Sequence, residues 1–134
     1  MTPSDIRRLK DLARRVKEVQ VARFAEERRR AAALLAELSG VTGEIGAARQ
    51  SMSHSDDPVL LTVGDRWTQS AERRLASLAQ ILEAQRAVED TARTEAAKAA
   101  GREEAIGLIE REIARLRRHA ARRRAEQEGQ GTSI

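Results

Sequence analysis

Residue types suited to acid–base or metal chemistry are scarce in this sequence. The two histidines, His54 and His119, lie far apart, and neither has a carboxylate or second histidine at metal-ligand spacing. The glycine-rich stretch 40–46 lacks the lysine of a phosphate-binding loop and carries Glu44, which would repel phosphate. No serine stands in a nucleophile elbow, and there is no cysteine. We therefore predict no enzyme activity, no cofactor and no metal site.

Arginine clusters are the remaining candidates for a binding site. One occupies positions 28–30, and a larger one ends the chain, with Arg115, Arg117, Arg118, Arg122, Arg123 and Arg124. The formal net charge of +4 favours acidic partners. The alternative is structural, because cations are favourable at a helix C-terminus and exposed arginines solvate a long helix. Nucleic-acid binding would require aromatic side chains for base stacking or a known nucleic-acid-binding motif, and the only aromatic residues are Phe24 and Trp67.

The element that must position these charges is a long helix over residues 64–123. Steps of alternately three and four residues trace a mostly apolar seam, without proline, which predicts a helix that buries a narrow stripe against another helix. The seam would comprise Gly64, Trp67, Ala71, Arg74, Leu78, Ile81, Gln85, Val88, Ala92, Glu95, Ala99, Arg102, Ile106, Ile109, Ile113, Leu116, Ala120 and Arg123. Two apolar blocks, 75–88 and 106–116, flank a polar, pliant middle.

An earlier helix carries two shorter seams. Leu9, Leu12, Val16 and Val19 form the first, and Ala31, Leu34, Leu38, Val41, Ile45, Ala48 and Met52 form the second. The two do not share a register, so we expect a discontinuity across residues 23–27, which locally rewinds a coiled coil. Phe24 lies near it, either as a seam residue or as an aromatic that binds a partner.

These patterns predict an all-α fold, a long two-helix antiparallel coiled-coil hairpin in a single domain, 1–126. Helix 1 should cover about 3–50, because Thr2 and Pro3 suit a helix start, and helix 2 about 58–126, opened by Asp57 and Pro58. The serine- and aspartate-rich stretch 51–57 would be the hinge, and residues 127–134 a disordered tail. Gly40, Gly43 and Gly46 would soften the end of helix 1. A dimer of extended chains is the open alternative.

The compartment expected by default is the cytoplasm. The N-terminus shows no secretory pattern, and no window approaches about 18 uncharged apolar residues, the minimum for a membrane span.

A resemblance to a known family rests on residues 66–85, Arg-Trp-Thr-Gln-Ser-Ala-Glu-Arg-Arg-Leu followed by Leu-Ala-Gln-Ile-Leu-Glu-Ala-Gln from position 78. In this stretch an aromatic residue follows a polar hinge and is followed by leucines and an Ile…Gln pair. This order of residues resembles the post-hinge segment of the FliJ-like family of flagellar export proteins and their injectisome counterparts. The resemblance implies a two-helix antiparallel coiled coil that acts in flagellar or type III protein export.

It further implies a stalk inside a hexameric export ATPase, with residues 6–24 and 106–124 in the pore. The hinge half would face an export gate protein, at the inner membrane periphery, and the protein would escort export chaperones. The residues predicted to bind partners are Arg7, Arg8, Phe24, Met52, Leu60, Trp67, Arg115, Arg117, Arg118 and Arg122.

Two alternatives stay open at this point. A structural coiled-coil adaptor would self-associate through the blocks 75–88 and 106–116. A basic helix that binds nucleic acid or anionic lipid would lose affinity steeply with salt.

Overall fold

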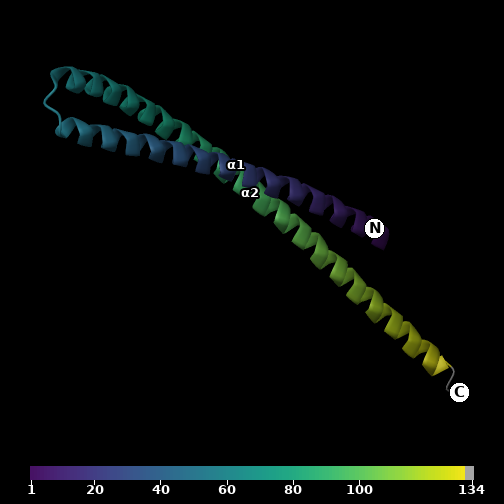
Figure 1. The fold of residues 1–134 in the computed structure, drawn as a ribbon. Helices are drawn as coiled ribbons and strands as arrows, with labels where there is room; N and C mark the ends of the chain where they lie inside the picture. Colours follow the sequence, from purple (N-terminus) through teal and green to yellow (C-terminus); the bar gives the residue numbers. More distant parts are fainter. Residues whose placement is uncertain (132–134) are drawn as a thin grey trace. The chain divides into compact units, whose positions relative to one another are not determined.

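Two α-helices make up the computed structural model, which describes residues 1–131 (Figure 1). Helix α1 spans Pro3–Ser53 and helix α2 spans Pro58–Gly131. They pack antiparallel in each of two compact units, which are described separately below. The predicted all-α two-helix hairpin is confirmed.

Both helix starts use the expected residues. The Thr2 hydroxyl accepts a hydrogen bond from the Asp5 amide at 3.2 Å, and the Asp5 carboxylate accepts one from the Thr2 amide at 2.9 Å. This reciprocal arrangement is a capping box, and its hydrogen bonds hold the pKa of Asp5 below its ordinary value. At α2, the Asp57 carboxylate accepts from the Val59 amide at 3.0 Å, while Pro58 takes the first helical position.

The connection between the helices is shorter than the expected hinge. α1 continues to Ser53, so only residues 54–57 leave the helix. The amides of His54 and Ser55 donate to the carbonyls of Ser51 and Met52, which satisfies two of the last carbonyls of α1. Nor do the glycines at 40, 43 and 46 interrupt α1, which runs through them unbroken.

The C-terminal end of α2 differs from the expectation. The helix continues to Gly131, beyond the expected end near Glu126, so residues 127–131 of the predicted tail are helical. The helix formers between 126 and 128 favour propagation of an existing helix, and a glycine near its end weakens but does not break it. The rest of the predicted tail, 132–134, lies outside the described residues.

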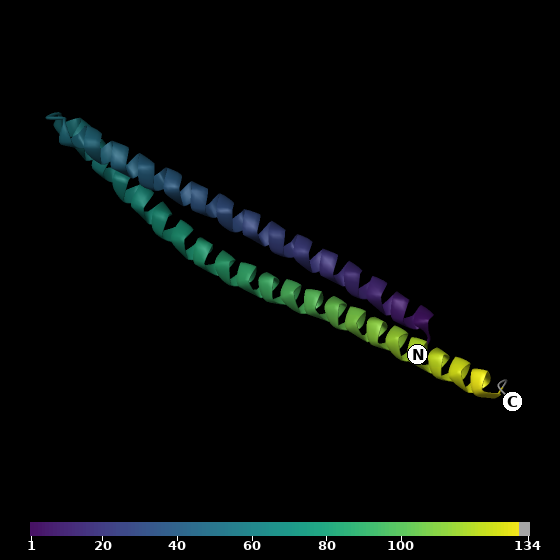
Figure 2. The same cartoon turned by 90° about the horizontal axis from the view of Figure 1, so that it is seen from below.

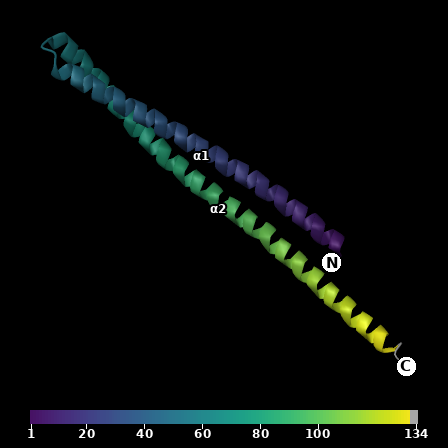
Figure 3. The ribbon, with the colours of Figure 1, turned by 60° about the horizontal axis from the view of Figure 1, so that its bottom comes forward.

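Unit 2 covers residues 22–93 and contains the connection between the helices (Figure 3). Its core is a cluster of Val41, Ile45 and Leu78, against which Leu34, Leu38, Ala71 and Leu75 pack. Val41 also lines a depression with Trp67, Ala71 and Arg74. Val41 and Ile45 therefore lie beside residues 67–74 of α2.

Unit 1 combines residues 1–21, most of them in α1, with residues from 94 onward in α2. Here Ile6, Ala96 and Ala99 are buried, and ion pairs join the helices. α2 extends beyond the N-terminus of α1 (Figure 2), and its side chains from 115 to 131 are exposed.

Every second position of the predicted α2 seam is correct. Counting by sevens from Gly64 to Ile113, these residues are buried or half-buried as expected. The other predicted half is wrong, because each inner position is the residue that follows the predicted one: Thr68, Leu75, Leu82, Glu89, Ala96, Glu103 and Glu110. Apolar residues stand on both sides of the true seam, as in Ile81 and Leu82, so periodicity alone does not distinguish the two.

The predicted discontinuity in α1 is also wrong. The inner positions follow one unbroken heptad register: Ile6, Lys10, Ala13, Lys17, Gln20, Phe24, Glu27, Ala31, Leu34, Leu38, Val41, Ile45, Ala48 and Met52. A continuous helix changes register only through inserted or skipped residues, and α1 has no such break. Lysine and glutamine therefore occupy inner positions in unit 1, and the predicted seam residues Leu9, Leu12, Val16 and Val19 are exposed.

Candidate partner-binding surfaces

The inner face of α1 in unit 1 is largely polar. The Lys17 ammonium lies 2.5 Å from the Glu103 carboxylate, and Arg14 lies 3.6 Å from the same group. The hydrogen bond from Lys17, with the positive charges of Lys17 and Arg14, holds the pKa of Glu103 below its ordinary value despite partial burial. Lys10 pairs in the same way with Glu110 at 3.6 Å. Ion pairs thus take the places where a coiled coil usually has apolar residues.

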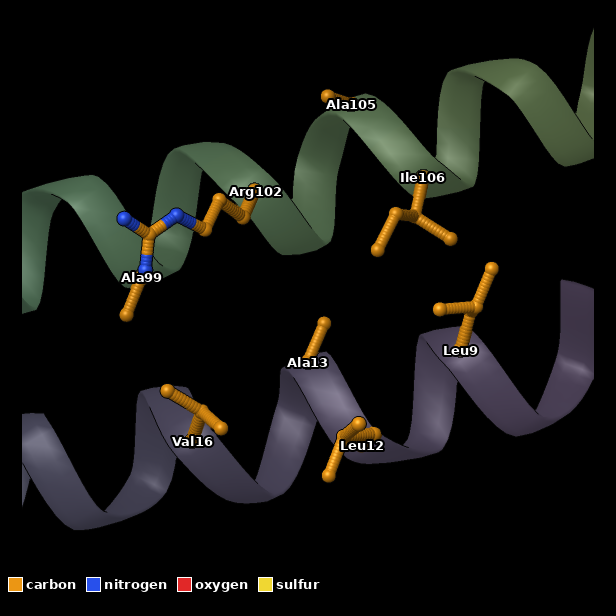
Figure 4. A pocket seen from close by; sticks show the side chains of 8 residues that line it. All are labelled: Leu9, Leu12, Ala13, Val16, Ala99, Arg102, Ala105 and Ile106. Carbon is orange, nitrogen blue, oxygen red and sulfur yellow. The ribbon is translucent and has the colours of Figure 1, made fainter.

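The apolar residues of this segment line an open groove between the two helices, here called the terminal groove. Figure 4 shows it: the α1 residues Leu9, Leu12, Ala13 and Val16 lie across from Ala99, Arg102, Ala105 and Ile106 of α2. Leu9 and Leu12 remain 39% and 59% exposed. Arg102 is the only charged residue in the lining, so the groove offers apolar surface to a partner.

The exposed residues on α1 have the spacing of a second seam. Leu9, Leu12, Val16 and Val19 follow one another by three, four and three residues, and Val19 is 65% exposed. We call this set the outer strip. A strip with this spacing fits the face of another helix. α1 therefore carries, beside its inner positions in unit 1, a second row of apolar residues, of which Leu9, Leu12 and Val16 border the terminal groove and Val19 is the most exposed.

The basic residues predicted to bind partners fall into different settings within unit 1. Arg7 and Arg117 line a depression between the helices, beside Ile6, Ile113 and Glu110. Arg8 and Arg122 are exposed on their helices, and Arg118 lines a shallow depression of α2 with Arg115.

Arg115 differs from these arginines because a carboxylate already compensates its charge. Its guanidinium donates to both oxygens of the Glu112 carboxylate, at 3.1 and 2.7 Å. This pairing raises the pKa of Arg115 and lowers that of Glu112. The structure thus brings Arg7 and Arg117 together, whereas Arg115 is engaged within its own helix.

Three predicted residues meet in unit 2, beside the connection between the helices. Met52, Leu60 and Trp67 line an apolar groove, here called the hinge groove, together with Ala48, Ser51, Val63 and Gly64. Gly64 permits the Met52 side chain to approach the α2 backbone closely, because a Cβ atom at this position would lie 2.9 Å from the Met52 sulfur. Leu60 and Trp67 are each about half exposed, at 50% and 42%. The hinge groove is the second apolar surface that a partner could cover.

Phe24 lines neither of the two grooves. It occupies an inner, half-buried position in unit 2, and the Arg93 guanidinium lies 5.4 Å from its ring centroid. Nearby, the Gln85 amide donates to the Glu27 carboxylate at 2.6 Å and to the Glu27 carbonyl at 3.1 Å. Of the two interpretations of Phe24, its position matches that of a seam residue.

No other chemistry is evident in the part of the chain that the structure describes. No cluster of three or more histidine, cysteine, aspartate or glutamate side chains within residues 1–131 could hold a metal ion. Within the same residues, neither helix has an apolar stretch that could cross a bilayer.

Comparisons with protein-family models, with curated proteins and with solved structures found no match. The resemblance to the FliJ-like family therefore depends on the post-hinge residues 66–85 and on the hairpin architecture.

Sequence reasoning missed the outer strip because it assigned those residues to the interface with α2. A signal was present in the sequence. Extending the seam of Ala31 through Met52 toward the N-terminus by heptads places Lys17 and Lys10 inward, and Leu12 and Val16 outward. The apolar character of Leu9 through Val19 outweighed that register in the prediction.

Proposed function

We propose that this protein is a non-enzymatic coiled-coil component of the flagellar or type III protein export apparatus. The observation that carries the proposal is the antiparallel two-helix hairpin, in which the post-hinge segment 66–85 resembles that of the FliJ-like family. In this role it acts as the stalk within an export ATPase hexamer and as an escort for export chaperones. It works in the cytoplasm, peripherally at the inner membrane.

Unit 1 is the part that would enter the ATPase ring. It holds the basic residues Arg7 and Arg117 in one depression and the apolar terminal groove in another. Arginine side chains can pair with carboxylates on a pore wall, and the apolar groove can accept side chains from the ring. The hinge groove with Trp67 would contact the export gate protein.

The test is the ATPase activity of the export ATPase from the same organism, measured with and without the purified protein. We expect stimulation that is weakened by the double variant Arg7→Glu/Arg117→Glu. The matched control is Arg73→Glu, an exposed arginine in unit 2, which should leave stimulation unchanged. The proposal fails if the wild-type protein neither binds nor stimulates the ATPase.

A structural coiled-coil adaptor is the second candidate, and the outer strip favours it. The blocks 75–88 and 106–116, proposed from sequence as self-association surfaces, are only partly available. Leu75, Leu78 and Leu82 pack inward, whereas Ile81, Val88 and Ile109 are exposed. An adaptor of this kind would bind a helix of another protein without changing any ATPase rate. Unchanged ATPase activity in the assay above, together with tight binding of a partner helix, would therefore favour the adaptor.

A further inference from the structure

The arginine-rich end of α2 is a strongly charged, exposed surface of unit 1. Residues 115–124, here called the basic run, contain six arginines and no acidic residue, and all ten side chains are exposed. α2 extends here beyond the N-terminus of α1 (Figure 2), which leaves the later part of the basic run uncovered. A run of this charge favours a partner with closely spaced negative charges.

Most guanidinium charges of the basic run are not compensated within the chain. Arg115 pairs with Glu112 of its own helix. Among residues 1–131, no ion pair involves the other five arginines of the run: Arg117, Arg118, Arg122, Arg123 and Arg124. The next acidic residues, Glu126 and Glu128, follow the run and mark its end. These five arginines can therefore bind an external anion without first breaking an internal ion pair.

The arginines of the basic run form two rows on opposite sides of the helix. Arg115, Arg118 and Arg122 follow one another by three and four residues, so they share one side. Arg117 and Arg124 are seven residues apart and share the other side. The positive charge thus surrounds the helix and is not confined to a single face.

A small side chain separates the two rows. Ala121 is exposed, and it stands three residues after Arg118, four after Arg117 and three before Arg124. Residues three and four apart are neighbours on a helix surface, so Ala121 has an arginine row on each flank. One narrow face of the helix can therefore approach a surface closely while guanidinium groups extend to both sides of it.

A concave partner with negative charge on both walls fits this arrangement. The major groove of double-stranded DNA has a phosphate backbone along each wall, and its width of about 12 Å admits a helix of about 10–12 Å diameter. With Ala121 toward the base edges, the two arginine rows point to the two backbones. From this complementarity we infer that the basic run binds double-stranded DNA in the major groove, through contacts to phosphates.

Other anionic partners fit the basic run less well. A bilayer is flat and would leave one arginine row unused, and Leu116 is the only large apolar side chain that the run could insert. Duplex RNA has a deep, narrow major groove that does not admit a helix in this way. Aromatic side chains stack on the bases of single strands and are not needed for phosphate contacts, so their scarcity does not count against duplex DNA.

This inference goes beyond the proposed function in export and does not depend on it. DNA binding is measured with the purified chain alone, and the variant described next leaves Arg7 and Arg117 unchanged. Failure of either proposal therefore leaves the other untouched.

Fluorescence anisotropy of a labelled DNA duplex of about 20 base pairs, or two helical turns, provides the first test. We expect the full chain to bind at low salt, whatever the base sequence, because phosphate contacts carry no sequence information. The triple variant Arg118→Gln/Arg122→Gln/Arg124→Gln, which removes arginines from both rows, should raise the dissociation constant by at least about tenfold.

The matched control removes the same charge from the other arginine cluster. Arg28→Gln/Arg29→Gln/Arg30→Gln lies in unit 2, where Arg29 and Arg30 pair with Glu26 and Glu27. It should change the dissociation constant by less than about twofold, and circular dichroism must show both variants helical. Absence of DNA binding at low salt, or equal weakening by the two triple variants, overturns the inference.

The salt dependence of binding reports how many phosphates the basic run contacts. A plot of the logarithm of the binding constant against that of the salt concentration should have a slope of about −4 to −5 for the wild type. The slope should fall to about −2 in the triple variant of the basic run, because three phosphate contacts are lost. An unchanged slope in that variant would contradict the assignment of these arginines to phosphates.

Duplex RNA and lipid vesicles distinguish the classes of partner. Anisotropy with an RNA duplex of the same sequence, and cosedimentation with vesicles of phosphatidylcholine and phosphatidylserine, should both show weaker binding than DNA at the same salt concentration. Equal or tighter binding to duplex RNA would overturn the placement in the DNA major groove. Binding to the vesicles without binding to DNA would identify an anionic membrane as the partner and overturn the inference.

Discussion

The position of the seam in α2 leads to a sharp prediction for a pair of neighbouring residues. Leu82 is 6% exposed and Ile81 is 51% exposed, although the sequence pattern favours Ile81 as the inner residue. We therefore compare Leu82→Ala with Ile81→Ala, which remove the same number of carbon atoms from adjacent positions of one helix.

The expected magnitudes follow from burial. Truncating leucine to alanine removes three carbons, and each buried methylene contributes about 0.8 kcal/mol, so Leu82→Ala should cost about 2–3 kcal/mol with a small cavity term. About half of that contribution is available at Ile81, and alanine regains a few tenths of a kcal/mol through its helix propensity. Ile81→Ala should therefore cost less than about 1 kcal/mol.

Urea unfolding followed by circular dichroism at neutral pH measures both changes in the free energy of unfolding. Equal slopes of free energy against urea would show that the comparison concerns stability and not a change in the unfolded chain. If Ile81→Ala costs as much as Leu82→Ala, or more, the register described for α2 is wrong. The outward position of Ile81 would then be wrong with it.

Two further predictions concern the glycines and the ion pairs. Gly43→Ala should raise the free energy of unfolding by about 0.5–1 kcal/mol, because a Cβ there meets no atom within 4 Å and alanine favours helix. Gly64→Ala should gain less in the same urea assay, since its Cβ would press on the Met52 side chain. Glu103, whose pKa Lys17 lowers, stabilises the fold above its unfolded pKa of about 4.3 and loses that contribution as the pH falls through its lower folded pKa. Glu103→Gln should therefore reduce the loss of stability between about pH 5 and pH 3, and an unchanged pH profile would contradict that pairing.

Much of the architecture could be predicted from local chemistry. The helix starts at Pro3 and Pro58 follow from capping residues and from the fixed backbone of proline, which act within one turn. The antiparallel pairing follows from a short polar connection between two amphipathic helices. The hinge groove also could be anticipated, because Met52, Leu60 and Trp67 flank that connection closely in sequence.

The sequence by itself determined that the chain forms two long helices with heptad-spaced apolar residues, since helix propensity and periodicity are properties of the local chain. Only the tertiary structure decided which of two neighbouring strips faces inward. Where the outward strip is as apolar as the inward one, as with Leu12 against Ala13 or Ile81 against Leu82, the choice depends on which residues the opposite helix presents. Lys17 faces Glu103 in unit 1 because their ion pair stabilises that register. The same choice leaves the residues of the outer strip exposed.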